Sequence, residues 1–141
     1  MHDLTSVLGA ALLVLVAGCS NVRSSTVHTG ANRHAPHQGA VTVQATQVPP
    51  QAEELAVVQT RGHNVELSDL VPDFAREVAK VGGNFGKVDK IRTKFEVTQQ
   101  NRQETYQCGT QDAPQTCTRT VTDQVEIATT TITGRAFRVS Q

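Results

Sequence analysis

Three cysteines are the residues of this chain most able to do chemistry, and they lie at positions 19, 108 and 117. A cysteine can be acylated, oxidised to a disulfide or bound to a metal ion, and its surroundings decide which of these happens. Cys19 follows an apolar N-terminal run, whereas Cys108 and Cys117 lie close together in a polar part of the chain. The sequence therefore predicts a different chemistry for Cys19 than for the other two.

Cys19 directly follows an apolar run and two small residues. Positions 12–16 are all apolar, and Ala17 and Gly18 separate them from Cys19. The run is too short to cross about 30 Å of hydrocarbon as a helix, and it matches the apolar region and cleavage site of a secretory signal peptide. The stretch Val16-Ala17-Gly18-Cys19 resembles the lipobox of bacterial lipoproteins, whose cysteine becomes the acylated first residue. We predict a lipoprotein signal peptide over residues 1–18 and lipidation of Cys19; the alternative is an ordinary secretory signal with a coincidental cysteine.

The lipobox resemblance also predicts a location. The stretch Met1-His2-Asp3 lacks the Lys or Arg of a signal peptide's first region, so we expect the true start to lie upstream. Ser20 follows the cysteine, and the resemblance implies that a non-acidic residue there sends the protein to the outer membrane. Three acyl chains would hold it permanently, since each buried CH₂ contributes about 0.8 kcal/mol. We expect a lipid-anchored outer-membrane protein whose domain faces the periplasm.

Cys108 and Cys117 enclose eight turn-rich residues, 109–116. With Cys19 acylated they are the remaining thiols, in a compartment where disulfides form and persist. We predict a Cys108–Cys117 disulfide that stabilises the tip of a polar hairpin by about 2 to 3 kcal/mol in the chain-entropy model. Zinc would need two further ligands, and a redox pair normally has Cys-x-x-Cys spacing, so both are weaker alternatives.

Three histidines, at positions 28, 34 and 37, are of a type that binds zinc or copper. They lie in residues 20–40, which are rich in Ser, Gly, Asn, Thr and His and have no apolar period. Such a segment buries too little surface to offset its ordering entropy, and it offers no neighbours to orient metal ligands. We predict that residues 19–40 are the lipidated cysteine and a disordered tether, with no metal and no other cofactor.

Catalytic patterns are absent from the sequence. His63 is the one histidine in residues 41–141, and neither Gly-x-Ser-x-Gly nor His-Glu-x-x-His occurs. Glu53 and Glu54 are adjacent, so on a strand they would point to opposite faces. The stretch GGNFGK at 82–87 lacks the glycine spacing and hydroxyl residue of a phosphate-binding loop, and it follows a predicted helix rather than a strand. We expect a protein that is not an enzyme.

The charge balance excludes a generic nucleic-acid binder. The 141 residues include 13 Lys and Arg against 13 Asp and Glu, whereas phosphate neutralisation needs a surplus of basic side chains on one face. Aromatic residues are 4% of the chain and Trp is absent, which leaves few of the large side chains that anchor a core. We predict one small domain over residues 41–141.

Hydrophobic periodicity predicts the elements of this domain. Residues 41–45 and 55–60 are typical of short strands. Apolar residues from Leu67 to Val81 follow helical spacing, with Ser68 or Asp69 as a possible cap and Pro72 in the first turn, and Gly82 would end the helix. These patterns predict a helix packed on a small sheet.

A second set of patterns predicts the hairpin. Residues 91–97 alternate, with Ile91, Phe95 and Val97 facing the core, and residues 98–105 have no apolar face, which indicates a ribbon that projects past the core. On the return strand Val125 and Ile127 would face inward, and residues 134–139 form a last strand. The predicted fold class is therefore α+β: a small sheet, one amphipathic helix packed on it and a disulfide-stapled β-hairpin.

The two cysteines and the inward residues demand different registers. Direct pairing of Cys108 with Cys117 would place Val97 opposite Ala128. The inward residues of the two strands all have odd numbers, so direct pairing among them requires a register that differs by one residue. The strand register must therefore shift by one residue between the core and the tip. We predict a β-bulge near Gln99 to Gln103, or a break in the ribbon.

The order of these features resembles a known family. A helix that ends in Ala79-Lys80-Val81-Gly82-Gly83-Asn84, a hairpin and a closing Gly134-Arg135-Ala136-Phe137 strand follow a lipobox and a polar segment. Over residues 41–139 this resembles the RcsF-like envelope-stress-sensor lipoproteins of the bacterial outer membrane, although that family has two disulfides between distant segments rather than one within a hairpin. The resemblance implies an α+β fold and a surface that contacts envelope proteins.

The expected function is therefore binding rather than catalysis. We expect a membrane-anchored lipoprotein whose periplasmic domain binds another envelope protein, for sensing or as an assembly scaffold, and no nucleic acid. The alternatives are a passive structural subunit of an envelope complex and, less favoured, a metal-binding lipoprotein.

Overall fold

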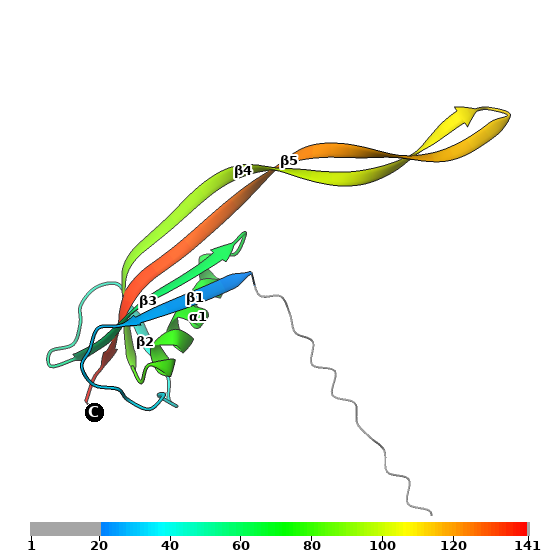
Figure 1. Cartoon of the computed structure of the whole chain (residues 1–141). Helices are drawn as coiled ribbons and strands as arrows, with labels where there is room; N and C mark the ends of the chain where they lie inside the picture. The colour runs from blue at the N-terminus through cyan, green and yellow to red at the C-terminus, as the bar shows by residue number, and fades with distance from the viewer. Residues whose placement is uncertain (1–20, 141) are drawn as a thin grey trace, which may run out of the picture.

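A five-stranded sheet with one helix on one of its faces forms the base of the molecule, and two of the strands continue far beyond it (Figure 1). The computed structural model describes residues 21–140. The strand order is β1-β3-β5-β4-β2, in which β2 and β4 are parallel and the other neighbours are antiparallel. In chain order the elements are β1 (Val22–His28), β2 (Thr42–Gln44), β3 (Glu53–His63), α1 (Leu67–Lys80), β4 (Phe85–Thr110) and β5 (Ala113–Arg138).

The core lies between α1 and the sheet. Leu70, Phe74 and Val78 recur every four residues on one face of the helix and are fully buried. They meet Val58 and Ile132 from β3 and β5. The helix approaches the sheet closely because Gly134 lies beneath it: a Cβ there would come within 2.7 Å of the Phe74 ring. The observed sheet, helix and hairpin confirm the α+β prediction.

Backbone groups, rather than a capping side chain, define the two ends of α1. Glu66 is the N-cap and its side chain makes no capping bond, whereas Ser68 and Asp69 lie inside the first turn, so the predicted side-chain cap is wrong. At the other end Gly82 has a φ of 88° and its N–H donates to Ala79 O at 2.9 Å. Glycine reaches this left-handed region without a Cβ clash, which confirms the predicted stop.

Residues 22–28 are a strand, so the prediction of a disordered tether over residues 19–40 is wrong for them. Every residue of β1 pairs with β3, from Val22 opposite Gly62 to His28 opposite Ala56. The connection that follows is also bonded to the domain, since Gly30 N–H donates to Leu55 O and His37 N–H donates to Ala79 O at 2.8 Å. A polar segment becomes ordered here because the edge of β3 supplies hydrogen-bond partners, which the local sequence pattern does not reveal. The folded unit thus includes residues before the predicted boundary at 41.

Several predictions fall outside the described residues. The signal peptide of residues 1–18 and the lipidated Cys19 are among them. Within residues 21–140, α1 is too short to span a membrane.

The inward face predicted for β4 is wrong. Ile91 is paired with the buried Ile132 and lies on the helix side of the sheet, yet it is 49% exposed, and Phe95 and Val97 are 64% and 66% exposed. These residues lie along β4 as it leaves the sheet, where α1 does not cover them. Val125 and Ile127 are opposite Thr98 and Glu96, on the other face of the strand pair.

The register change is real but lies elsewhere. β4 and β5 shift by one residue between Val88 and Lys90, next to the core, and no shift occurs from there to the tip. The predicted bulge between Gln99 and Gln103 is therefore wrong in position. The shift lies at Asp89, within the base, where β5 is still paired with β3 on its other side.

Candidate functional site

The candidate site is the two-stranded part of β4 and β5, residues 95–110 and 113–128, which we call the ribbon. β3 pairs with β5 as far as Thr129, and Asn64 also bonds both backbone groups of Ala128; from Ile127 to the tip, β4 and β5 pair only with each other. Sixteen residues at about 3.3 Å each give the ribbon a reach of roughly 50 Å. Figure 1 shows it twisting away from the base as a single arm.

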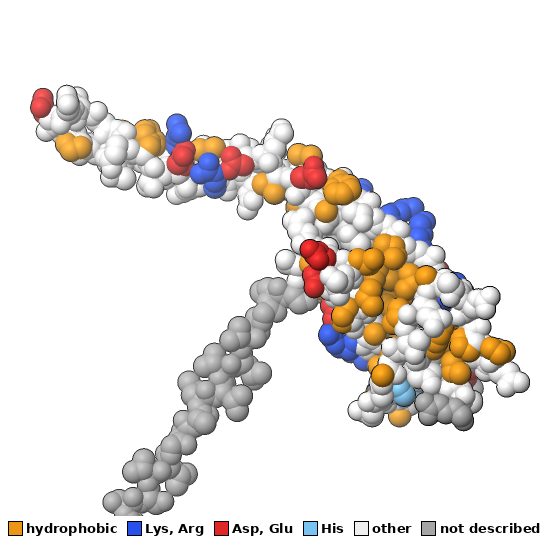
Figure 2. Space-filling model, turned by 180° about the vertical axis from the view of Figure 1, so that it is seen from behind, with side chains coloured by type: hydrophobic (Ala, Val, Ile, Leu, Met, Phe, Trp, Pro, Cys, Tyr) orange, Lys and Arg blue, Asp and Glu red, His pale blue; other side chains and the backbone are white. Residues whose placement is uncertain are grey.

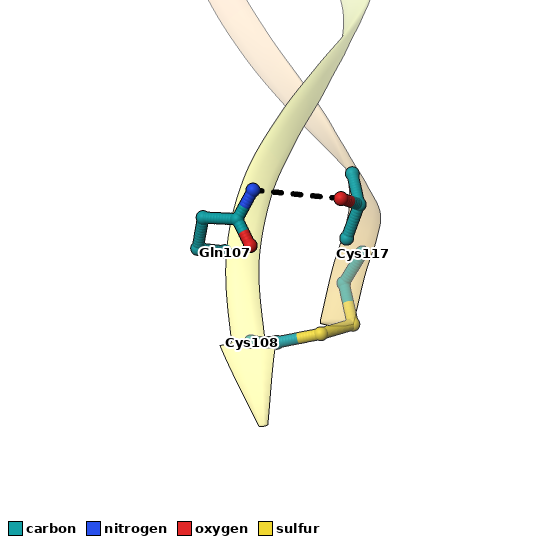
Figure 3. Close-up of a disulfide and its surroundings, with 4 residues drawn as sticks. Gln107, Cys108 and Cys117 are labelled. Carbon is teal, nitrogen blue, oxygen red and sulfur yellow. Dashed lines mark hydrogen bonds between the residues drawn. A yellow bond between two sulfur atoms is a disulfide. The ribbon is translucent and has the colours of Figure 1, made fainter. Parts of the chain in front are cut away.

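A disulfide closes the far end of the ribbon, as predicted. Cys108 and Cys117 are bonded, with their Cα atoms 5.8 Å apart (Figure 3). They are diagonal rather than directly opposite, because Cys108 pairs with Gln115 and Cys117 pairs with Tyr106. Diagonal neighbours share a face of the strand pair, so the bond forms without a register change. Gly109, which follows Cys108 near the end of β4 and pairs with Pro114, has a φ of 102°.

Polar cross-strand pairs line the middle of the ribbon. Arg119 donates to Glu104 at 2.8 Å and its guanidinium lies 5.2 Å from the centre of the Tyr106 ring. Arg102 forms an ion pair with Asp123 on the same face, and Gln107 donates to Thr116 beside the disulfide (Figure 3). Exposed pairs of this kind each contribute little to the free energy of unfolding. They fix the register of the ribbon, which has no core of its own.

Both edges of the ribbon are open within the part of the chain that the structure describes. β2 pairs with β4 only at Phe85–Lys87, and β3 leaves β5 at Thr129. An open edge presents unpaired N–H and C=O groups to which another strand can bond. The ribbon therefore has backbone bonding capacity along most of its length.

Apolar side chains lie exposed at the root of the ribbon. Phe95 and Val97 follow Ile91 on one face of β4. Figure 2 shows hydrophobic side chains gathered over the base, whereas the ribbon is mostly polar with scattered apolar and charged groups. An open strand edge beside exposed apolar side chains offers both backbone bonds and burial to a partner.

Two of the histidines weighed as metal ligands, and the carboxylate of Glu53, are used in local contacts. His34 Nε2 is 3.0 Å from Glu53 Oε2 and His37 Nε2 is 3.3 Å from Ala40 O. Hydrogen bonding by Asn32 holds the pKa of Glu53 below its usual value. Across residues 21–140 no three His, Cys, Asp or Glu side chains are grouped as a metal ion would need. At the end of β3, His63 Nδ1 is hydrogen-bonded to Thr129 Oγ1 at 2.9 Å.

No protein-family model, curated protein or solved structure matches this chain. Its function is therefore inferred from its own surfaces.

The sequence alone does not reveal a group of cations on the sheet face away from α1. Arg23 and Arg61 lie opposite each other on the sheet face away from α1, and Lys90 and Arg92 lie on that same face. The alternation of Lys90, Arg92 and Lys94 along one strand was a visible signal of a basic face. Arg23 and Arg61 gave no such signal, because only the pairing of β1 with β3 brings them there.

Proposed function

We propose that this protein is a non-enzymatic, lipid-anchored envelope protein whose domain binds another envelope protein through the ribbon. The ribbon carries the proposal: an arm with two open edges is held in one register by ion pairs and a disulfide, with exposed apolar groups at its root. An isolated two-stranded ribbon is at best marginally stable in water. A partner that adds a strand to its edge would complete the sheet.

A sensor or scaffold role fits this surface better than a passive structural role. The Phe95 and Val97 side chains would be buried by a partner at the root, whereas the polar middle of the ribbon gives specificity through its charged pairs. The resemblance to envelope-stress-sensor lipoproteins remains part of the proposal.

In-cell photocrosslinking tests the proposal. A photoreactive residue at Thr105 or Thr118, which are directly opposite on the ribbon, should give the same protein adduct by mass spectrometry. The same residue at Lys80 on the exposed face of α1 should not give it. Capture of lipid alone at the ribbon positions would show that the ribbon does not bind a protein.

Substitutions at the root of the ribbon sharpen this test. Replacing Phe95 and Val97 by Ser should reduce the crosslink from Thr105 at least fivefold, because the partner would lose apolar contact. Stability should change by less than about 0.5 kcal/mol, since both side chains are exposed. Val27→Ser is the matched control, because Val27 is also 66% exposed but lies on β1. An equal loss in the control would contradict a role for the ribbon root.

The anchor is tested separately. Cys19→Ala should abolish labelling with radioactive fatty acid and release the protein from the membrane fraction. If the variant is labelled and fractionates like the parent, the anchor is wrong even if the ribbon binds a partner.

A further inference from the structure

The sheet face away from α1 carries two neighbouring rows of donor side chains. Thr60 and Ile132 are opposite each other and buried beneath the helix, so the residues on either side of them in the strands point to the other face. The register extends these two rows across four strands. We call this surface the basic face; one row is Arg23, Arg61, Thr131 and Arg92, and the other is Ser25, Gln59, Thr133 and Lys90.

The cations of the basic face have no partners among residues 21–140. Nine of the 13 Lys and Arg side chains bond to a carboxylate or a carbonyl oxygen. The four that do not are Arg23, Arg61, Lys90 and Arg92. All four belong to the basic face. The overall neutrality of the chain thus hides a local surplus of positive charge.

This arrangement is unfavourable for the fold by itself. Arg23 and Arg61 are directly opposite on adjacent strands, and like charges in that position repel each other. Neighbouring rows are balanced: Lys94 is paired with Glu96, and Arg135 is paired with Glu54 and Asp89. The unpaired positive charge is therefore confined to the basic face, where these exposed cations are free to bind an anion.

Two adjoining grooves lie on the basic face. Arg23, Ser25, Gln59 and Arg61 line a groove of about 330 Å³. A second groove of about 270 Å³ is lined by Lys90, Arg92, Thr131 and Thr133, and Gln59 borders both. Each groove thus combines two cations with hydroxyl or amide groups and contains no carboxylate.

The donors favour phosphate over carboxylate. A guanidinium group binds two oxygens of a phosphate at once, and hydroxyl and amide donors can bond the remaining ones. A terminal phosphate carries up to two negative charges on three acceptor oxygens, and a phosphodiester carries one charge on two free oxygens arranged tetrahedrally, whereas a carboxylate carries one charge on two oxygens in a plane. Arg61 and Arg92 are two strands apart, about 10 Å, so one phosphate cannot neutralise both grooves.

We propose that the basic face binds a ligand with at least two phosphate groups, one in each groove. Two sources share this chemistry: a phospholipid headgroup and a soluble polyphosphate. Arg23 is four residues from Cys19, at most about 14 Å along the chain, so headgroups of an anchoring membrane would be within reach. That source rests on the proposed anchor, whereas the binding chemistry of the basic face does not.

Calorimetric titration of the full chain in neutral detergent micelles tests the proposal. One arm adds sodium tripolyphosphate, and another adds cardiolipin, which has two phosphates, to the micelles; phosphatidylcholine is the lipid control. Binding in the tripolyphosphate arm alone would identify a soluble ligand, and binding of cardiolipin alone would identify a headgroup. Binding in both arms supports the shared chemistry, and binding in neither overturns the proposal.

Charge-removing variants connect the binding to the basic face. Arg61→Gln combined with Arg92→Gln should weaken binding at least tenfold, and raising the salt concentration should weaken the parent's binding more than the variant's. The matched control removes two charges from α1, by Arg76→Gln and Lys80→Gln, and should bind as the parent does. Equal weakening by both pairs would overturn the site.

Stability separates binding from a structural role. Removing Arg61 relieves its repulsion of Arg23, so the melting temperature of the double variant should be unchanged or higher while affinity falls. If the double variant does not fold, the exposed Arg92→Gln alone is compared with Arg76→Gln. Benzenehexacarboxylate that binds as tightly as tripolyphosphate would overturn the assignment to phosphate. None of these results depends on acylation of Cys19 or on crosslinking of the ribbon.

Discussion

Asp89 connects the register shift to the charges around it. Its carboxylate accepts from Arg135 at 2.9 and 3.1 Å and from Lys87 at 2.7 Å, at the position where β4 and β5 shift by one residue. The hydrogen bonds from Arg135, with a further contribution from Lys87, hold the pKa of Asp89 below its ordinary value of 3.8. A single acidic residue thus accepts hydrogen bonds from both strands at the register shift, within the base.

Asp89→Asn should destabilise the fold by about 1 kcal/mol at neutral pH, since the ion pair is partly exposed. Because the folded-state pKa is lowered, the carboxylate's contribution is complete above the ordinary pKa and is lost as the pH falls through the lowered one. Urea unfolding at pH 7 and pH 2.5 should therefore show a gap between parent and variant that is smaller at the lower pH. A gap of equal size at both pH values would contradict this role.

Gly134→Ala should be far more damaging. A Cβ there would lie 2.1 Å from Lys87 O, a backbone atom that cannot move without breaking the β4–β5 pairing. We expect a loss of more than about 2 kcal/mol in the free energy of unfolding. The control Thr118→Ala, on the exposed ribbon, should change it by less than about 0.5 kcal/mol. Similar denaturant midpoints for the two variants would be evidence against this close packing.

At the scale of the elements, the disulfide determines the stability of the ribbon rather than that of the base. It encloses a short loop at the tip, far from the buried face of α1. Cys108→Ser should therefore speed amide hydrogen exchange in residues 98–125 by at least tenfold, because the ribbon loses about 2 kcal/mol of local stabilisation. Exchange in α1 should not change. The double variant with Cys117→Ser controls for a free thiol, and faster exchange throughout α1 would show that the ribbon is part of one cooperative unit.

The sequence predicted elements whose signal is local. The helix was readable because Leu70, Phe74 and Val78 repeat at helical spacing and Gly82 ends them. The disulfide was readable from cysteine spacing. The exposure of Phe95 and Val97 could not be predicted, because alternation indicates which residues share a face of a strand but not what covers that face. The order in residues 22–28 depends on β3, which is far away in the sequence.

At the scale of the whole molecule, β1 makes residues 22–28 part of the folded base. Its backbone is bonded along its length to β3, and Ser24 Oγ is 3.0 Å from the buried Thr60 Oγ1. Amide hydrogens in this segment should exchange at least a hundredfold more slowly than in an unfolded peptide of the same sequence. Mass-spectrometric exchange on the intact chain measures this rate. If these amides exchange as fast as in a free peptide, residues 22–28 are disordered as the sequence predicted. Arg23 would then not be held opposite Arg61 in the basic face.

The central strand β5 belongs to both the base and the ribbon, and this has a mechanical consequence. A pull on the stapled tip, directed along the arm, passes through β5 into the middle of the sheet. There its hydrogen bonds to β3 run across the direction of force, so tension shears ten paired positions together instead of peeling them apart in sequence. If the chain is anchored at its N-terminus and bound at the tip as proposed, tension along the arm would therefore load all ten of these paired positions at once.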